Sequence, residues 1–418
     1  MSFLGELAAR RRFGMKPGLE TIRALCAALG DPQLKFKAIH VAGTNGKGAV
    51  CAILDAALRS HKGSGGVPPP HIGRYTSPHL VKINERFFLD GAPVDDATLE
   101  RIAQRVESSI LRLRLDSTPT FFEALTAVAF LLYAEAKVDC AILECGLGGR
   151  LDATNVCNPA ISVITRIGLD HCDWLGDTVE KVSAEKAGIV KPGVPVVLGL
   201  NEPSVVEVVR RRAAEVGVPF HYAPDLADES EIPAGFSLPG AFNRENAVTA
   251  LAALKVLRGG GRLQSVAVDG FRHVVWPGRF QRVGDFIVDG AHNPPAARAL
   301  RAALEAEGLG HRTLGLICGF CGDKDVDEVL SILAPIVKKG YAVKTNNPRS
   351  LTAEETAAKM RAAGIDAVAC SSLRAAIEHS NNRTLICGSL FLAGEALVEL
   401  GAYPWGPVRF DKAELLKA

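Results

Sequence analysis

A glycine-rich stretch that ends in lysine lies near the start of the chain, at residues 41–48 (Val-Ala-Gly-Thr-Asn-Gly-Lys-Gly). The preceding residues 38–41 predict a short buried strand, and residues 49–58 carry apolar side chains at helical spacing. Backbone amides at the start of such a helix, with the Lys47 ammonium as a point charge, suit the phosphates of a nucleoside triphosphate. An ordinary strand-to-helix turn is the alternative for these eight residues taken alone.

This stretch departs from the usual phosphate-loop pattern G-x-x-x-x-G-K-[S/T] at both ends. Val41 stands where the first glycine would be, and Gly48 replaces the hydroxyl residue that normally contacts magnesium. A magnesium ion that accompanies ATP therefore needs ligands from other parts of the chain.

Three side chains that could bind this magnesium ion follow other predicted elements. Glu144 ends the apolar run 141–144, His171 lies just after a second strand-like run, and Ser77 precedes a proline that fixes the turn. Open α/β sheets bind ligands outside the carboxyl ends of their strands, where these side chains would meet. Glu144 and His171 also have plain structural explanations, as a solvated strand end and as a histidine that makes a structural hydrogen bond.

The second half of the chain offers further polar groups next to strand patterns. Arg279 follows a Pro-Gly turn, and residues 289–294 (Asp-Gly-Ala-His-Asn-Pro) follow a predicted strand. Both could reach a nucleotide held by the first domain, because clefts between domains are favoured ligand sites. The alternatives are an interdomain salt bridge and a polar turn. Lys186 is ambiguous from its spacing, and an exposed surface lysine is the default for it.

Length and composition describe a globular protein of two domains. The 418 residues exceed the ~250–300 at which one core stops growing, and we place the boundary so that residues 1–278 and 279–418 form the two domains. Strand and helix patterns alternate throughout, which predicts an α/β fold with parallel sheets covered by helices. A helix is expected at 121–136, and strands are expected at 138–144, 160–165, 195–200, 285–290, 314–317, 340–343 and 384–387.

Charge and hydropathy exclude several classes of partner. The net charge of +2 argues against a large nucleic-acid footprint, and the longest apolar candidate, 124–134, is too short for a membrane span. Residues 1–13 lack the apolar core of a signal peptide. We therefore expect a cytoplasmic protein that binds small molecules and neither nucleic acid nor membrane. We also expect it to be a monomer.

Ten cysteines are scattered along the chain, most of them inside apolar runs, so disulfides are not indicated. Cys318 and Cys321 have the spacing of a redox or half-zinc motif but lack the second pair that such a site needs. The glycine- and proline-rich residues 63–70 predict a mobile loop with a stiff end.

Taken in order, seven blocks of the chain closely resemble the folylpolyglutamate synthase/dihydrofolate synthase family, a branch of the Mur ligases. They are residues 43–48, 76–80, 144–155, 169–171, 185–189, 277–280 and 289–294. The run Gly-Leu-Gly-Gly-Arg-Leu-Asp-Ala-Thr-Asn at 146–155 is the most specific of them, and the resemblance extends over nearly the whole chain. It implies an N-terminal P-loop ATPase domain with a mainly parallel sheet and a smaller, Rossmann-like C-terminal α/β domain. It also implies a ligase that uses ATP to join L-glutamate to dihydropteroate or to the γ-carboxylate of a (tetrahydro)folate through an acyl phosphate.

The resemblance further implies three sets of site residues, among which Lys47, Lys186 and His171 would be catalytic. The ATP contacts would be Gly43, Thr44, Asn45, Gly46, Lys47, Gly48, Ala49, Asn246, Arg279, Asp289 and His292. Two magnesium ions would be held by Ser77, Glu144, His171 and Lys186, with Lys186 carbamylated. The pterin portion of the substrate would contact Thr120, Phe121, Phe122, Leu151, Asp152 and Ala153. Phe122 would stack on the pterin ring, and Asp152 would accept hydrogen bonds from it.

The chain departs from the family pattern in two places. Ala49 stands where the family usually has serine or threonine, which removes one phosphate contact. Residues 63–70 replace a compact turn and strand. Neither change removes a proposed metal ligand.

Two other functions remain as alternatives. One is a Mur ligase that adds amino acids to a UDP-linked precursor, although the roughly forty residues before the glycine loop are fewer than an extra domain needs. The other is a P-loop ATPase switch that hydrolyses ATP without ligation. Phosphate release that does not require glutamate would identify the switch.

Overall fold

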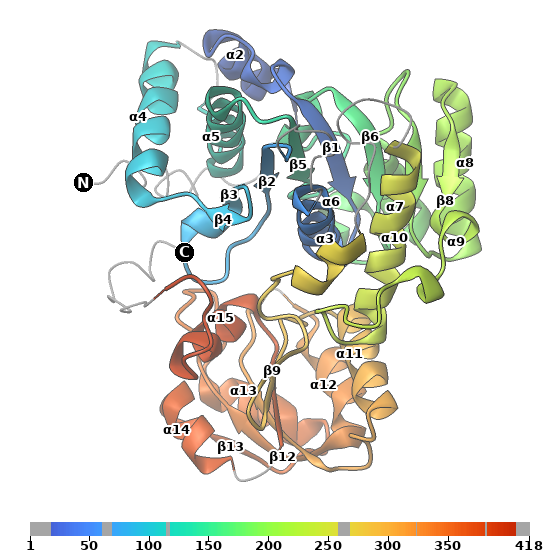
Figure 1. The fold of residues 1–418 in the computed structure, drawn as a ribbon. Coiled ribbons are helices and arrows are strands. Elements are labelled where there is room, and N and C mark those ends of the chain that lie inside the picture. Colours follow the sequence, from blue (N-terminus) through green and yellow to red (C-terminus); the bar gives the residue numbers. More distant parts are fainter. Residues whose placement is uncertain are drawn as a thin grey trace. The chain divides into compact units, whose positions relative to one another are not determined.

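The computed structural model describes residues 18–60, 69–113, 118–257, 268–322, 324–380 and 383–406 (Figure 1). Most of the expected loop at 63–70, and residues 1–13, lie outside these ranges. The chain divides into two compact units. The N-terminal unit consists of Met1–His79, Ile83–Ser237 and Asn243–Val274, and the C-terminal unit of Leu80–Lys82, Leu238–Phe242 and Val275–Ala418.

The N-terminal unit is built on an eight-stranded sheet of order β4-β3-β2-β5-β1-β6-β7-β8. Within this sheet, the neighbours along β2-β5-β1-β6-β7-β8 all pair in parallel. Strand β3 pairs antiparallel with both β2 and β4. The strands are β1 Lys37–Ala42, β2 Ile72–Tyr75, β3 Phe87–Leu89, β4 Ala92–Pro93, β5 Cys140–Glu144, β6 Pro159–Ile164, β7 Val196–Leu198 and β8 Phe220–Tyr222.

Helices connect and cover these strands, as parallel pairing requires. They are α2 Glu20–Ala28, α3 Lys47–Arg59, α4 Asp96–Arg112, α5 Phe121–Ala136, α6 Cys172–Leu175, α7 Val179–Ala187, α8 Pro203–Val216, α9 Ala223–Leu226 and α10 Ala241–Leu257. Short 3₁₀ turns lie at η2 Pro32–Leu34, η4 Ile83–Arg86, η5 Ala153–Val156, η6 Glu229–Glu231 and η8 Val268–His273. One apolar core joins α2, α4 and α5 to the sheet, and another lies between β6, β7, α7 and α8.

Helix α5 illustrates how local sequence sets an element. Thr120 and Glu123 form a reciprocal capping box at its start, and Lys137 ends it in the left-handed conformation, with φ 52°. Its bounds are those predicted from the sequence. Because the helix is apolar on every side, it is buried among α2, α4 and the sheet.

The C-terminal unit has a six-stranded sheet of order β13-β12-β11-β14-β10-β9, parallel except for the edge strand β9. Its strands are β9 Gln281–Val283, β10 Phe286–Val288, β11 Leu314–Cys318, β12 Val337–Ala342, β13 Ala367–Ala369 and β14 Thr384–Cys387. Its helical elements are α11 Pro294–Ala306, α12 Val326–Leu333, η9 Ala334–Ile336, α13 Ala353–Ala362, α14 Leu373–His379 and α15 Leu390–Glu399. Apolar cores lie on both faces of this sheet.

Several predicted strands are longer than those of the structure. The run 138–144 contains β5 only from Cys140, because the Val138 amide closes the end of α5 on the Tyr133 carbonyl. The run 195–200 contains β7, which is Val196–Leu198. All ten cysteines are free thiols. No helix in the described ranges is both long enough and apolar enough to cross a membrane.

Candidate active site

The glycine-rich loop lies at the carboxyl end of β1, the strand between β5 and β6. Gly43 has φ 150°, and a Cβ atom there would lie 1.9 Å from Oγ1 of Thr165. Gly46 has φ 85°, and a Cβ atom there would lie 2.2 Å from Oδ1 of Asn246. Both positions therefore require glycine, and the Asn246 amide lies directly against the loop.

The loop is held by hydrogen bonds to the segment 165–168 that follows β6. The carbonyl of Arg166 accepts the amides of Thr44 and Asn45, at 2.9 and 3.2 Å. The Thr165 hydroxyl donates to the Asn45 carbonyl at 2.7 Å. The Thr44 hydroxyl donates to the Gly168 carbonyl at 2.9 Å and accepts its amide at 3.1 Å. Since these contacts use the amides of Thr44 and Asn45, the first amides of α3 are the donors that the loop offers to an anion.

Glu144 and Ser77 are neighbours, as the positions of their strands predict. Glu144 is the last residue of β5 and is buried, and Ser77 follows the adjacent strand β2. Oε2 of Glu144 accepts the backbone amide of Ser77 at 2.9 Å. A carboxylate and a hydroxyl residue therefore share one edge of the sheet, beside the glycine loop.

Lys186 lies on α7 and is only 3% exposed, so the alternative of a surface lysine is wrong. Its Nζ donates to the Gly43 carbonyl at 2.8 Å. Burial, followed by the positive charge of nearby Lys47, lowers the pKa of Lys186 to about 7. Lys47 itself donates to the Thr44 carbonyl at 3.1 Å. A large fraction of Lys186 is therefore neutral, and so nucleophilic, near neutral pH.

His171 precedes α6 with φ 53°, and its side chain is 42% exposed. Its Nε2 lies 3.8 Å from Oδ1 of Asp170. The charge of Asp170 acts to raise the pKa of Lys186, against the larger effect of burial. Leu175 of α6 lies close to Gly148, because a Cβ atom at Gly148 would be 3.1 Å from the Leu175 side chain. The loop after β6 thus lies beside Lys186 and the loop after β5. The approach of His171 to Glu144 stays a prediction.

The ready-made cluster of three or more His, Cys, Asp and Glu side chains that many metal sites contain is absent from the described part of the chain. The predicted set does not depend on such a cluster, because it takes oxygen from Ser77, Glu144 and a modified Lys186 and nitrogen from His171.

Two of the residues predicted to contact a pterin, Phe122 and Asp152, lie at the turn formed by Gly146. A Cβ atom at Gly146 would lie 2.5 Å from Cζ of Phe122, and the Gly146 amide donates to Oδ2 of Asp152 at 2.9 Å. The Phe122 ring centroid lies 6.1 Å from that of Tyr75. Phe121 has the Arg86 guanidinium over its ring at 5.7 Å.

Asp152 uses its carboxylate to organise its own loop, between half-buried Leu151 and buried Ala153. Oδ2 accepts the amides of Gly146 and Leu147, and Oδ1 accepts the amide and the hydroxyl of Thr154. Burial raises the pKa of Asp152. The Thr120 hydroxyl likewise donates to Glu123 within the cap of α5. The sequence did not anticipate these intramolecular roles.

In the C-terminal unit, Arg279, Asp289 and His292 lie on two adjoining turns, which the Gly290 amide joins by donating to the Gly278 carbonyl at 2.9 Å. Asp289 is buried, and burial raises its pKa while the charge of Arg279 opposes that shift. Its oxygens accept the amides at positions 280 and 291, both at 2.7 Å. Nδ1 of His292 lies 2.9 Å from the Gly290 carbonyl.

Asp289→Ala is expected to destabilise the C-terminal unit by about 2–4 kcal/mol, because two buried amides lose a charged acceptor. Thermal unfolding of the purified variant measures this effect. Asp285→Ala, which removes an exposed carboxylate just before β10, is the control. Equal unfolding temperatures for the two variants would contradict the assigned role of Asp289.

Sequence reasoning missed two polar residues that hold the glycine loop, Thr165 and Asn201. Thr165 ends the predicted strand 160–165 and directly follows β6, and Asn201 directly follows the predicted strand 195–200, which contains β7. The rule that selected Glu144, a polar residue at the end of an apolar strand, would have found them.

The chain is similar to characterised ligases over most of its length. It is 33% identical over 376 residues to a dihydrofolate synthase/folylpolyglutamate synthase of Bacillus subtilis, which covers 83% of this chain and 85% of that protein. Residues 41–254 match the family described as Mur ligase middle domain, and residues 278–390 match Mur ligase, glutamate ligase domain. This chain belongs to the dihydrofolate synthase/folylpolyglutamate synthase family of Mur ligases.

Solved structures of this family agree with the fold. Escherichia coli FolC in complex with DHPP and ADP superposes with a TM-score of 0.83 at 30% identity, covering 96% of this chain and 98% of that one. A bifunctional folylpolyglutamate synthase/dihydrofolate synthase with Mn, AMPPNP and L-glutamate bound gives a TM-score of 0.80 at 29% identity, covering 96% and 98%. The predicted family, the α/β fold class and the activity of an ATP-dependent ligase are confirmed.

Proposed function

We propose that this protein joins L-glutamate to dihydropteroate, to the γ-carboxylate of a (tetrahydro)folate, or to both, and converts ATP to ADP and phosphate. The similarity to dihydrofolate synthases/folylpolyglutamate synthases, which extends over both units, is the observation that carries this proposal. The glycine loop, Glu144 and Lys186, gathered beside β1, supply the polar groups that the chemistry needs.

The reaction requires activation, because an amine cannot displace oxide from a carboxylate. An oxygen of the substrate carboxylate attacks the γ-phosphorus of ATP, the bond from phosphorus to the bridging oxygen breaks, and ADP leaves. The glutamate amine, after losing a proton, attacks the acyl carbon, and the carbon–oxygen bond to phosphate breaks. With ¹⁸O in the substrate carboxylate, the label is expected in the released phosphate, and its absence there would exclude the acyl phosphate.

ATP binding is assigned to the glycine loop, to Asn246 and to three residues of the second half of the chain. Lys47 and the first amides of α3 neutralise the phosphates, because they combine a point charge with the positive end of a helix. Asn246 lies against Gly46 and contacts the nucleotide from α10. The full set is residues 43–49 with Asn246, Arg279, Asp289 and His292.

Two magnesium ions would be held by Ser77, Glu144, His171 and the carbamate of Lys186. The donor set fits magnesium, which prefers oxygen ligands and few protein carboxylates. The ions would supply positive charge beside the transferred phosphoryl group. The Ser77 backbone amide donates to Oε2 of Glu144, so these two residues lie next to each other.

The burial of Lys186 and its lowered pKa support carbamylation of this residue. The neutral amine adds carbon dioxide and releases a proton, which replaces a buried cation by an anion. At pH 6, one unit below a pKa of about 7, only about a tenth of the amine is neutral. Enzyme equilibrated with ¹³C-bicarbonate is therefore expected to give a carbamate carbon resonance at pH 8 that is largely lost at pH 6.

The control for this resonance is a second partly buried lysine, Lys191, whose Nζ donates to the carbonyls of Asn155 and Cys157. Lys191→Ala is expected to keep the resonance and Lys186→Ala to lose it. A carbamate resonance in the Lys186→Ala protein would refute the assignment.

The pterin portion of the substrate is assigned to Thr120, Phe121, Phe122, Leu151, Asp152 and Ala153. Phe122 and Asp152 adjoin the same turn at Gly146, so one ligand could meet both. The Phe122 ring offers a stacking surface. Because Asp152 already accepts four hydrogen bonds from its own loop, its contribution includes holding that loop in shape.

The proposal is tested by measuring ADP production with dihydropteroate and with tetrahydrofolate, each with and without L-glutamate. ADP formation that requires both glutamate and a pterin compound supports the ligase and identifies its substrate. ADP release at full rate without glutamate would instead indicate an ATPase switch. Activity only with a UDP-linked acid would indicate another Mur ligase.

We also propose that residues 1–278 form the Mur-ligase-like domain for ATP and the pterin substrate, that residues 279–418 form the glutamate ligase domain, and that the enzyme is a cytoplasmic monomer. The match of residues 278–390 to the glutamate ligase domain supports the second assignment.

A further inference from the structure

The segment 165–168 determines where the glycine loop lies. Its backbone accepts the amides of Thr44 and Asn45 at Arg166 and pairs with the Thr44 hydroxyl at Gly168. A shift of this segment would therefore move the start of α3, whose amides face the phosphates in the proposed site. Beyond the end of β6 the segment pairs, among the described residues, only with the loop itself, through the Thr165 amide and Ala42 carbonyl and an isolated bridge between Arg166 and Asn45. Contacts from other elements therefore help to decide where the segment and the loop lie.

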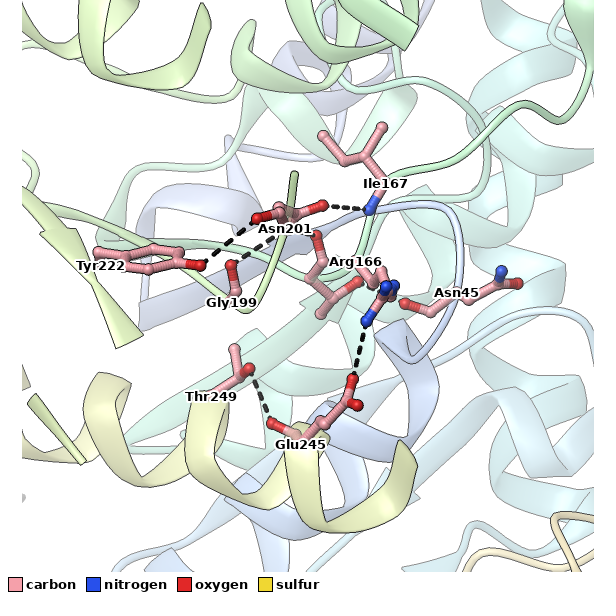
Figure 2. A network of polar contacts seen from close by, with 9 residues as sticks. Asn45, Arg166, Ile167, Gly199, Asn201, Tyr222, Glu245 and Thr249 are labelled. Carbon is pink, nitrogen blue, oxygen red and sulfur yellow. Dashed lines mark hydrogen bonds and ion pairs between the residues drawn. The ribbon is translucent and has the colours of Figure 1, made fainter. Parts of the chain in front are cut away.

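The Asn201 side chain fixes this segment. Its Oδ1 accepts the Ile167 amide at 2.7 Å, and its Nδ2 donates to the carbonyls of Thr165 and Gly199 at 3.1 and 3.0 Å. Asn201 is 9% exposed, and these bonds use both of its donors. Figure 2 shows dashed lines from Asn201 to Ile167 and Gly199, with Arg166 and Asn45 drawn nearby.

Asn201 is itself anchored to the edge of the sheet. It follows β7, and its carbonyl accepts the Tyr222 hydroxyl at the end of β8, at 3.4 Å (Figure 2). A series of hydrogen bonds therefore connects β8 to Asn201, Asn201 to the segment after β6, and that segment to the glycine loop after β1.

A second contact of the segment is weaker. Arg166 forms an ion pair with Glu245 of α10 at 3.1 Å, but these side chains are 49% and 33% exposed. Exposed pairs contribute little, because water and salt screen them and two long side chains must be ordered. Loss of a buried partner leaves backbone groups without hydrogen bonds, which costs more. The buried amide is the stronger of the two constraints.

We propose that Asn201 is a positioning residue for ATP, which holds the segment 165–168 so that the glycine loop presents its amides to the nucleotide. Asn201 does not touch the substrate in this arrangement. The inference rests on the proposed binding of ATP by residues 43–49.

The test compares Asn201→Leu with the wild-type enzyme in steady-state kinetics. Leucine keeps the shape of asparagine but removes its three hydrogen bonds. We expect the KM for ATP to rise about tenfold, while the KM values for glutamate and the pterin substrate stay within about twofold. An unchanged KM for ATP, or a parallel rise of all three KM values, would overturn the proposal.

The matched control is Asn84→Leu. Asn84 is buried in the same unit, near the opposite edge of the sheet, and donates to the Val94 carbonyl and the Asp96 carboxylate. Its loss is expected to lower stability without a selective change in the KM for ATP. If Asn201→Leu does not fold, Asn201→Asp is judged by the same criterion, because it keeps the acceptor for the Ile167 amide.

Hydrogen exchange gives a readout that does not depend on activity. Peptides that cover 43–48 and 165–168 are expected to lose protection in the Asn201 variant, whereas β1 keeps its protection. Unchanged exchange in both peptides would contradict the bracing role.

Lys47→Ala, measured alongside, separates the two proposals. If Lys47→Ala raises the KM for ATP and Asn201→Leu does not, the positioning role is wrong and the nucleotide loop stands. If neither variant affects ATP, the assignment of ATP to this loop fails, and the role of Asn201 fails with it.

Discussion

Lys186→Ala is expected to reduce turnover about a thousandfold, which is the upper range for removal of one group that stabilises charge in a transition state. The side chain is buried against the Gly43 carbonyl and, once carbamylated, would provide the anion that holds a second magnesium ion beside the phosphates. Alanine removes this anion but leaves the helix intact, because alanine has the highest helix propensity. Turnover of the purified variant, with circular dichroism to confirm its fold, measures the effect.

A short carboxylic acid such as acetate should partly restore activity to Lys186→Ala, because it can occupy the space of the missing carbamate. Lys181→Ala is the control on the same helix, since Lys181 is exposed and pairs only locally with Asp177. Turnover close to wild type in Lys186→Ala would remove this residue from the catalytic set. Rescue of the Lys181 variant by acetate would show that the acid acts elsewhere.

Lys186 also makes stability depend on pH in the unmodified protein. Its pKa is about 7 in the folded state and 10.5 when unperturbed. Between these values the unfolded chain binds more protons than the folded one, so rising pH favours the folded state. Lys186→Ala should lack this part of the pH dependence.

Glu144→Gln is expected to lower kcat about a hundredfold at low magnesium concentration. Removal of a residue that only supports a metal ligand typically costs about 10–100-fold, and loss of a ligand should cost at least as much. Glutamine keeps an oxygen that can accept the Ser77 amide, so the turn after β2 is preserved. The change removes the negative charge that a divalent ion requires. Titration of activity with magnesium should show the midpoint moved to higher concentration and activity partly recovered at saturation.

Glu107→Gln on α4 is the matched control, because Glu107 is also a buried glutamate of the N-terminal unit, 4% exposed like Glu144. Its magnesium dependence should equal that of the wild type. If Glu144→Gln and the wild type share one magnesium midpoint, Glu144 does not bind the metal.

The repeating elements of the fold could be predicted from the sequence because they depend on neighbours along the chain. The helix at 121–136 follows from its cap and its continuous apolar composition, and the strand at 384–387 from a short apolar run. Short strands such as β4 and β13 were missed. They contain two and three residues, too few for a period to be recognised.

The candidate site was only partly predictable. Glu144 was selected because a carboxylate ended an apolar strand, and the parallel pairing of β2 with β5 brings it to Ser77. Asp152 was expected to face a ligand, but its carboxylate binds the amides of its own loop. The sequence does not indicate whether a polar side chain in a loop will bind a ligand or the backbone of its own loop.

The sequence by itself determined the alternation of strands and helices that defines the fold class, the glycine-rich loop with its lysine and the family to which the chain belongs. Only the tertiary structure decided that Lys186 is buried against Gly43, 143 residues away, and that Asn201 fixes the segment supporting the loop. The reason is physical. Periodicity and turn chemistry are local properties, whereas burial, a lowered pKa and hydrogen bonds between distant segments depend on which atoms the folded sheet brings together.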